Sequence, residues 1–211
     1  MILTILTIES PKHAKRFAEF QHLAHERYAT YLAQEFHPYN ATSWYTAVKP
    51  YHSGIFPFLA LDALVFFRGS PCHFFFGHDL LPFGTMTREE LELDPAVKDE
   101  VDKIINRDPS PKSLIEFHGF GTRIDIGLNA LGVLYLDILD SLTKVEAEVL
   151  SHLRTLQYDK YKDPMNVKTF GLQKQVAKKL EKSPVAVHKS LRSAKYPLLA
   201  ETATAMKAMM V

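Results

Sequence analysis

The sequence predicts an α/β or α+β layer over residues 1–142, followed by an all-α helix-turn-helix unit over residues 143–211. Short strand-like and helical stretches alternate in the first part, which is typical of one layered core. The charge balance changes sign near residue 143. Residues 1–142 hold 12 Lys+Arg and 18 Asp+Glu, a balance of −6, whereas residues 143–211 hold 13 and 6, a balance of +7. A split of this kind suggests that the second part faces a polyanion.

The first strand and helix follow from local patterning. Residues 2–8 mix threonine with apolar, often β-branched side chains, which predicts a strand. Ser10 and Pro11 then supply an N-cap and a proline for the first helical turn. Apolar residues recur at helical spacing over residues 12–36, and Pro38 follows, so we expect one long amphipathic helix there.

The remaining elements of the first part are shorter. We expect a second strand over residues 43–48, closed by Lys49-Pro50, and a helix over residues 56–67 that ends at Gly69. Residues 72–77 predict a third strand with aromatic side chains buried on both faces. A short helix begins at Asp94-Pro95 and runs to about residue 105. A fourth strand over residues 115–120 and a long helix over residues 124–142 complete the layer.

The second part begins with a capping box. Thr143 at the N-cap and Glu146 three residues later satisfy backbone donors at a helix start. A polar loop over residues 158–169 follows this helix. Ala177 provides the small residue that a helix-turn-helix needs where its two helices cross, and Val187, ten positions on, provides the apolar residue of the second helix. Ser183 caps that second helix.

The side chains opposite this apolar pattern are mostly basic. We expect phosphate contacts from the first helix and the turn, and major-groove contacts from the second helix. The candidate DNA-binding residues are Lys174, Lys178, Lys179, Lys182, Ser183, Pro184, His188, Lys189, Arg192 and Lys195. The candidate turn, Glu181-Lys182, lacks the glycine that such turns usually contain. The other use of such a unit is contact with a protein such as a polymerase.

The composition of the chain and the length of its apolar runs exclude several classes of protein. The single cysteine, Cys72, excludes a disulfide framework within the chain. The apolar N-terminus lacks a basic region and a cleavage site, so it predicts a strand and not a signal peptide. No apolar run approaches the roughly 18 residues of a membrane span, which favours a cytoplasmic protein. The ten histidines follow no recognised ligand spacing, so we expect no metal site and no cofactor.

Two resemblances add to this pattern. Residues 143–199 resemble the helix-turn-helix of sigma-factor region four, through Leu142-Thr143, Glu146, Val176-Ala177, the run from Ser183 to Val187, and Leu191-Arg192. Over its whole length the chain resembles the SatD family of bacterial proteins. The residues that carry this second resemblance are the first strand running into Glu9-Ser10, Asp94-Pro95-Ala96, Ile124-Asp125 and Leu128-Asn129.

The SatD resemblance implies a ferredoxin-like, nucleotide-cyclase-like domain in front of the DNA-binding unit. Cyclase-like domains hold two metal ions on carboxylates, one on the first strand and one in the hairpin turn after the second. Here residues 2–8 contain no acid, and Lys49-Pro50-Tyr51-His52 stands where the turn is expected. The sequence therefore predicts a catalytically degenerate domain and a protein that is not an enzyme.

The resulting hypothesis is a DNA-binding transcriptional regulator of bacterial type. The domain over residues 1–142 would serve dimerisation or the sensing of a small-molecule effector, and residues 143–211 would bind double-stranded DNA as part of a homodimer. Two alternatives remain open. One is a nucleotide-binding or nucleotide-processing protein with an appended helix-turn-helix, and the other is an adaptor that binds polymerase or another partner.

Overall fold

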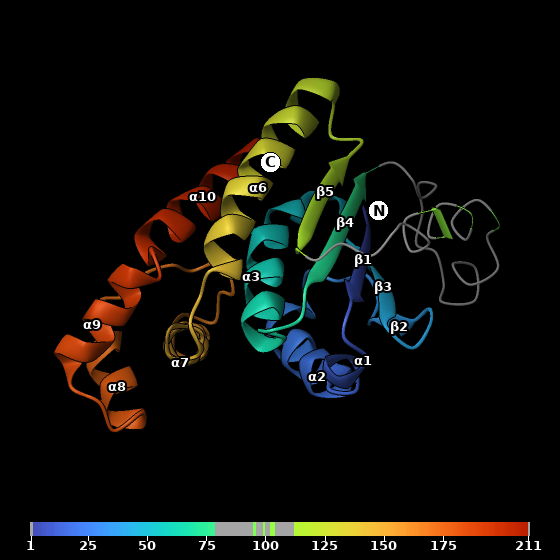
Figure 1. Cartoon of the computed structure of the whole chain (residues 1–211). Helices are drawn as coiled ribbons and strands as arrows, with labels where there is room; N and C mark the ends of the chain where they lie inside the picture. The colour runs from blue at the N-terminus through green and yellow to red at the C-terminus, as the bar shows by residue number, and fades with distance from the viewer. Residues whose placement is uncertain (1, 79–94, 96–98, 100–101, 104–111, 211) are drawn as a thin grey trace.

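The structure is a computed structural model that describes residues 2–78, 95, 99, 102–103 and 112–210 (Figure 1). Its strands are β1 (Ile2–Ile8), β2 (His37–Pro38), β3 (Ser43–Val48), β4 (Cys72–His78) and β5 (Leu114–His118). Its first helices are α1 (Pro11–Ala14), α2 (Phe17–Tyr28), the 3-10 helix η1 (Pro50–Ile55), α3 (Phe56–Phe66) and α6 (Thr122–Asp140). The chain continues with α7 (Lys144–Tyr161), α8 (Leu172–Lys179), α9 (Pro184–Ser193) and α10 (Tyr196–Met209).

The five strands form one mixed sheet in the order β2-β3-β1-β4-β5. The central strand β1 is antiparallel to both neighbours, with Ile5 opposite Tyr45 on one side and Phe75 on the other. β2 is antiparallel to β3, and β5 is parallel to β4. The chain is thus a mixed α/β protein of the α+β type, which confirms the coarse fold class predicted from the sequence.

Aromatic side chains join the helices to one face of the sheet. The ring of Phe17 in α2 stacks on Trp44 of β3 with 3.7 Å between centroids, and Phe56 of α3 stacks on Phe76 of β4 at 4.2 Å. The predicted burial of both faces of β4 is also found, because Phe75 is as buried as its neighbours Phe74 and Phe76.

The single long helix expected over residues 12–36 is wrong. The chain breaks between α1 and α2 and leaves the helix at Tyr28. The backbone N–H of Ala33 donates to the carbonyl of Ala47 (2.8 Å), and Leu32 bridges to Val48. Pairing with the end of β3 therefore replaces the last two helical turns that the apolar spacing predicts.

The hairpin turn of the sheet lies elsewhere than expected. Lys49 is the N-cap of η1 and residues 50–52 are its first turn, and the turn between β2 and β3 spans residues 39–42. Within that turn Asn40 accepts a hydrogen bond from the backbone N–H of Thr42 at 2.8 Å. The short helix predicted over residues 94–105 lies largely outside the described residues.

The helices after residue 143 pack directly on the rest of the molecule. α7 contacts α3, and α10 lies along α6, α3 and η1 (Figure 1). One cluster of buried apolar side chains runs from Ile2 in β1 to Met206 in α10. The expected boundary at residue 143 coincides with the start of α7, but the hydrophobic core is continuous across it.

No single helix in the described part of the chain has the length and apolar composition of a membrane span. Helices α6 and α7 reach that composition only when taken together, and they are bent by 114° at the break between them.

Candidate nucleic-acid interface

Helices α8 and α9 are joined by a four-residue turn, residues 180–183. Ser183 caps α9: its hydroxyl oxygen accepts a hydrogen bond from the backbone N–H of Ala186 at 3.1 Å, and Pro184 occupies the first turn. Ala177 is buried on α8, and Val187 and Leu191 are buried on α9. These positions are the ones that the spacing of the sequence assigns to the crossing point and to the inner side of the second helix.

The turn explains how the unit manages without glycine. Glu181 has a left-handed backbone with φ of 52°, the conformation that glycine normally supplies at the end of a helix. The backbone N–H of Lys182 donates to the carbonyl of Ala177 (2.9 Å), and that of Glu181 donates to Lys178 (3.4 Å). This is the Schellman pattern, and it satisfies the last carbonyls of α8 despite the cost of a side chain at this φ.

The outer side of α9 is solvent-exposed. His188, Lys189 and Arg192 are all exposed, and they lie opposite the buried pair Val187 and Leu191. Lys189 and Arg192 make no ion pair or side-chain hydrogen bond with any described residue. Two cations with a fixed spacing of one helical turn are therefore available to an external partner.

Further cations come from α8 and from the ends of α9. We use the term basic surface for the exposed cations Lys174, Lys178, Lys179, Lys189, Arg192 and Lys195. Lys182 differs, because it is only partly exposed and its Nζ lies 3.2 Å from Oε2 of Glu148 on α7. It belongs to the predicted set, but in this structure it links the turn to α7.

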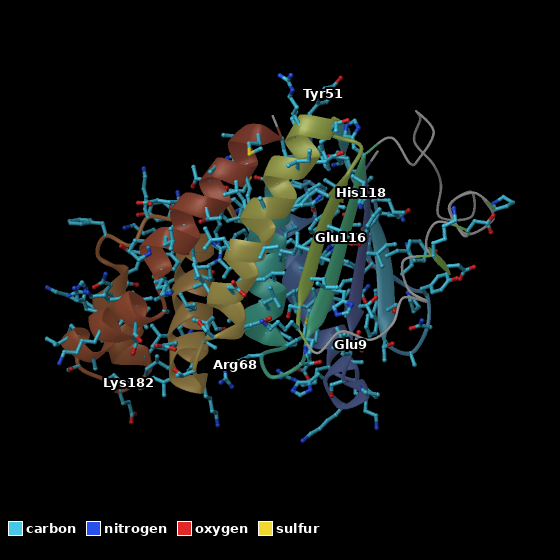
Figure 2. All side chains as sticks on the ribbon, turned by 45° about the horizontal axis from the view of Figure 1, so that its top comes forward. Glu9, Tyr51, Arg68, Glu116, His118 and Lys182 are labelled. Carbon is cyan, nitrogen blue, oxygen red and sulfur yellow. The ribbon has the colours of Figure 1, made fainter. Side chains whose placement is uncertain are left out.

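The basic surface lies at the end of the molecule farthest from the sheet, where α8 and α9 project (Figure 1). Figure 2 shows many nitrogen-tipped side chains extending from this region, where Lys182 is labelled, whereas the labelled acids Glu9 and Glu116 lie at the sheet. The cations of α8 and α9 are thus separated in space from the acids that lie at the sheet.

The pKa of His152 on α7 is affected by the positive charge of α8 and the turn. Partial burial lowers the pKa of His152, and the nearby cations Lys179 and Lys182 lower it further, against an opposing effect of Glu148. His152 therefore remains neutral at neutral pH, and it leaves the charge of the surface to the lysines and arginines.

Helix α9 is anchored to the start of α7. The capping box predicted from the sequence is present: Oε2 of Glu146 accepts from the backbone N–H of Thr143 at 2.7 Å, and Thr143 accepts from the backbone N–H of Glu146. Burial raises the pKa of Glu146, but hydrogen bonds from Ser193 and Thr143 lower it by more. Ser193 ends α9, and α9 packs against α7.

A buried ionic cluster, which no pattern in the sequence indicates, joins the two parts of the chain. Asp62 on α3 accepts hydrogen bonds from Arg27 (2.8 Å) and Tyr28 (2.8 Å) on α2, and from Nε of Arg154 (2.8 Å) on α7. All four residues are buried. Burial alone raises the pKa of Asp62, but Arg154 and Arg27 outweigh it and lower the pKa to about 2. The group therefore carries two guanidinium charges and one carboxylate.

The same arginine organises the loop that leads into α8. Arg154 donates to the carbonyl oxygens of Pro164 (2.5 Å) and Asn166 (3.2 Å). Its neighbour Gln157 donates to the carbonyl of Lys168 (3.1 Å) and to the hydroxyl of Tyr196 (2.8 Å). A buried charge with this many partners had no sequence signal, because lone Asp and Arg residues inside helical patterns usually face solvent.

Two exposed apolar side chains also lie beside the basic surface. Val185 is 63% exposed on the first turn of α9. Phe170 is 88% exposed just before α8. An apolar side chain at the start of a recognition helix can contact a thymine methyl group in the major groove.

The histidines, the acids and Cys72 were the other candidate groups. In the described part of the chain, no three side chains of histidine, cysteine, aspartate or glutamate gather in a way that would hold a metal ion. Burial, with smaller contributions from Asp140 and Glu9, raises the pKa of the Cys72 thiol, so the thiol stays protonated.

The strained turn supports a test of the interface. We expect Glu181→Gly to raise the free energy of unfolding by about 1 kcal/mol, because glycine adopts a positive φ without steric cost. It should also tighten binding to a polyanion, since it removes an acid beside the basic surface. Glu181→Gln is the matched control: it removes the charge but keeps the strain, so only the binding should change. A lower melting temperature for the glycine variant would contradict the assignment of this turn.

Comparison with known proteins identifies no relative: no family model, no curated protein and no solved structure matches the chain. The resemblance to the SatD family and to sigma-factor region four therefore stays a prediction.

Proposed function

We propose that this protein binds double-stranded DNA through α8 and α9, with α9 in the major groove, and acts as a transcriptional regulator. One observation carries the proposal. Helix α9 buries Val187 and Leu191 against its own unit while it presents Lys189 and Arg192, unpaired among the described residues, to solvent. Arginine and lysine on an exposed helix suit guanine edges and phosphates.

The start of α9 and the lysines of α8 also support DNA binding. The N-terminus of α9 is exposed at Ser183 and Pro184, and the positive end of the helix dipole there favours a phosphate. The lysines of α8 flank it, as expected for the first helix of a helix-turn-helix, which crosses the phosphate backbone while the second helix enters the groove. Phosphate contacts of this kind position the protein, and contacts from α9 to bases specify the sequence.

For the front part of the chain we propose a ferredoxin-like, cyclase-like unit without phosphoryl-transfer chemistry, which senses an effector or supports assembly. The order β2-β3-β1-β4, with β1 and β3 antiparallel to their neighbours, supports the ferredoxin-like pattern β-α-β-β-α-β. β1 carries no acid, and the hairpin at residues 39–42 offers Asn40 in place of a carboxylate. Magnesium in such sites relies on carboxylates.

The first test is a titration of labelled duplex DNA at several salt concentrations. We expect log K to fall linearly with log salt, with a slope of about −3 to −5 per protomer, because each phosphate neutralised contributes about −0.9. A slope of this size corresponds to four or five phosphate contacts made by the basic surface. Wild-type protein that binds no duplex at low salt would overturn the proposal. A protein partner that is retained after nuclease treatment would instead favour the adaptor.

A further inference from the structure

Helix α6 has an apolar side that no described residue covers. Its inner side buries Leu128, Tyr135 and Leu139, as expected for a helix packed on a sheet. On its outer side, however, Ile126 is 66% exposed and Val133 is 62% exposed. The outer residues, which recur at the spacing of one helical face, are Arg123, Ile126, Ala130, Val133, Leu134 and Asp137. We call them the α6 stripe.

The two ends of the α6 stripe carry opposite charges at equal distances from its centre. Arg123 lies seven residues before Ala130, and Asp137 lies seven residues after it. Both are exposed, and neither makes an ion pair or a side-chain hydrogen bond with a described residue. At 1.5 Å per residue they are about 21 Å apart along the helix, too far to neutralise each other.

We propose that the α6 stripe is the surface on which two copies of this chain form a dimer, with the two α6 helices antiparallel and the two-fold axis at Ala130. In this arrangement residues equally far from Ala130 meet. Arg123 faces the partner's Asp137, and Ile126 faces the partner's Leu134. The pattern complements itself, which is the requirement of an interface between identical subunits related by a two-fold axis.

Two features argue for a second copy as the occupant. The charges complement each other only in the antiparallel register, and both ion pairs then form at once, one at each end of the interface. One position of the neighbouring edge strand is also occupied: Asn129 accepts from the backbone N–H of Phe117 (2.8 Å) and donates to its carbonyl (3.1 Å). This position of β5 is thereby unavailable for strand addition, which favours the α6 stripe as the surface for a second copy in this region.

A dimer formed through the α6 stripe is independent of DNA binding, and its test needs no DNA. It would nevertheless give the proposed regulator two copies of α9 related by a two-fold axis, as expected for a protein that binds paired half-sites.

The test uses charge reversal at both ends, Arg123→Asp and Asp137→Arg, with molar mass in solution as the readout. Wild type should sediment at twice the 24.0 kDa of one chain. Each single variant should dissociate at least about tenfold more readily, because like charges then face each other at both ends of the interface. The double variant should regain the dimer. Mixing the two single variants should produce a heterodimer, since both end contacts become attractive.

Controls separate this result from general effects of charge. Lys15→Asp reverses an exposed charge at the C-cap of α1 and should leave the mass of the dimer unchanged. Thermal melting of every variant checks that it is folded, which we expect because the α6 stripe is outside the core. A wild-type protein that stays monomeric on concentration would overturn the proposal. So would single variants that remain as dimeric as wild type, or a mixture that fails to associate.

Discussion

Replacing Asp62 with asparagine should lower the free energy of unfolding by about 3–5 kcal/mol, because it leaves two buried guanidinium groups without their counter-charge. Arg27 and Arg154 have side chains that are 5% and 2% exposed, so water cannot replace the lost carboxylate. For a chain of this length that loss corresponds to a fall in melting temperature of roughly 6–20 °C. Chemical unfolding with urea measures the free energy directly.

Asp159→Asn provides the matched control for this substitution. Asp159 lies on α7, the helix that contributes Arg154 to the cluster, but the side chain of Asp159 is 52% exposed. The same chemical change there should alter stability by less than about 0.5 kcal/mol. Equal stability of the two variants would show that the Asp62 cluster does not hold the two parts of the chain together.

The same carboxylate gives stability a defined dependence on pH. The pKa of Asp62 is lowered from 3.8 to about 2 in the folded protein. The unfolded chain therefore binds this proton at a higher pH than the folded chain does. The stabilisation is fully present above about pH 4 and is lost as pH falls from there toward 2. In Asp62→Asn this contribution to acid unfolding should be absent.

The double variant Lys189→Ala, Arg192→Ala should bind duplex DNA roughly 30- to 700-fold more weakly than wild type, if two contacts worth about 1–2 kcal/mol each are lost. The salt slope should also become shallower by about 1 for each phosphate contact removed. Both residues are exposed on α9 with no described partner, so the folded structure should not suffer. Fluorescence anisotropy over a salt series measures the affinity and the slope together.

Lys12→Ala, Lys15→Ala is the control for net charge. It also removes two exposed lysines, but from α1 and its C-cap, and α1 lies on the far side of the molecule from α9 (Figure 1). Its affinity for DNA should stay within about threefold of wild type, because exposed charges more than a Debye length away are largely screened. An equal loss in both variants would mean that binding depends on total charge and not on α9.

The elements that the sequence predicted well are those with local causes. The start of α9 at Ser183-Pro184 and the start of α7 at Thr143 depend on hydrogen bonds that span only three residues. The strand in residues 72–77 is predicted by a run of aromatic residues that can only be buried. Such signals are complete within a few positions, so a single sequence suffices to find them.

The errors have a common physical reason. Residues 29–36 continue a helical pattern, yet the backbone of Leu32 and Ala33 pairs with the end of β3. The expected hairpin turn was wrong because β2 is only two residues long and contains Pro38, which conceals a strand. Both outcomes depend on partners that are distant in the sequence.

The sequence alone determined the α+β class, the N-caps of α7 and α9 and the basic character of the outer side of α8 and α9, since each depends on residue type at short spacing. Only the tertiary structure decided that Asp62 lies between Arg27 and Arg154, that Glu181 adopts the left-handed turn, and that the charges of α6 are symmetric on an exposed side. The first arises where α2, α3 and α7 pack together, the second where α8 joins α9, and the third on the side of α6 that faces away from the core. Burial changes what a charged side chain does, and burial is a property of the packed whole.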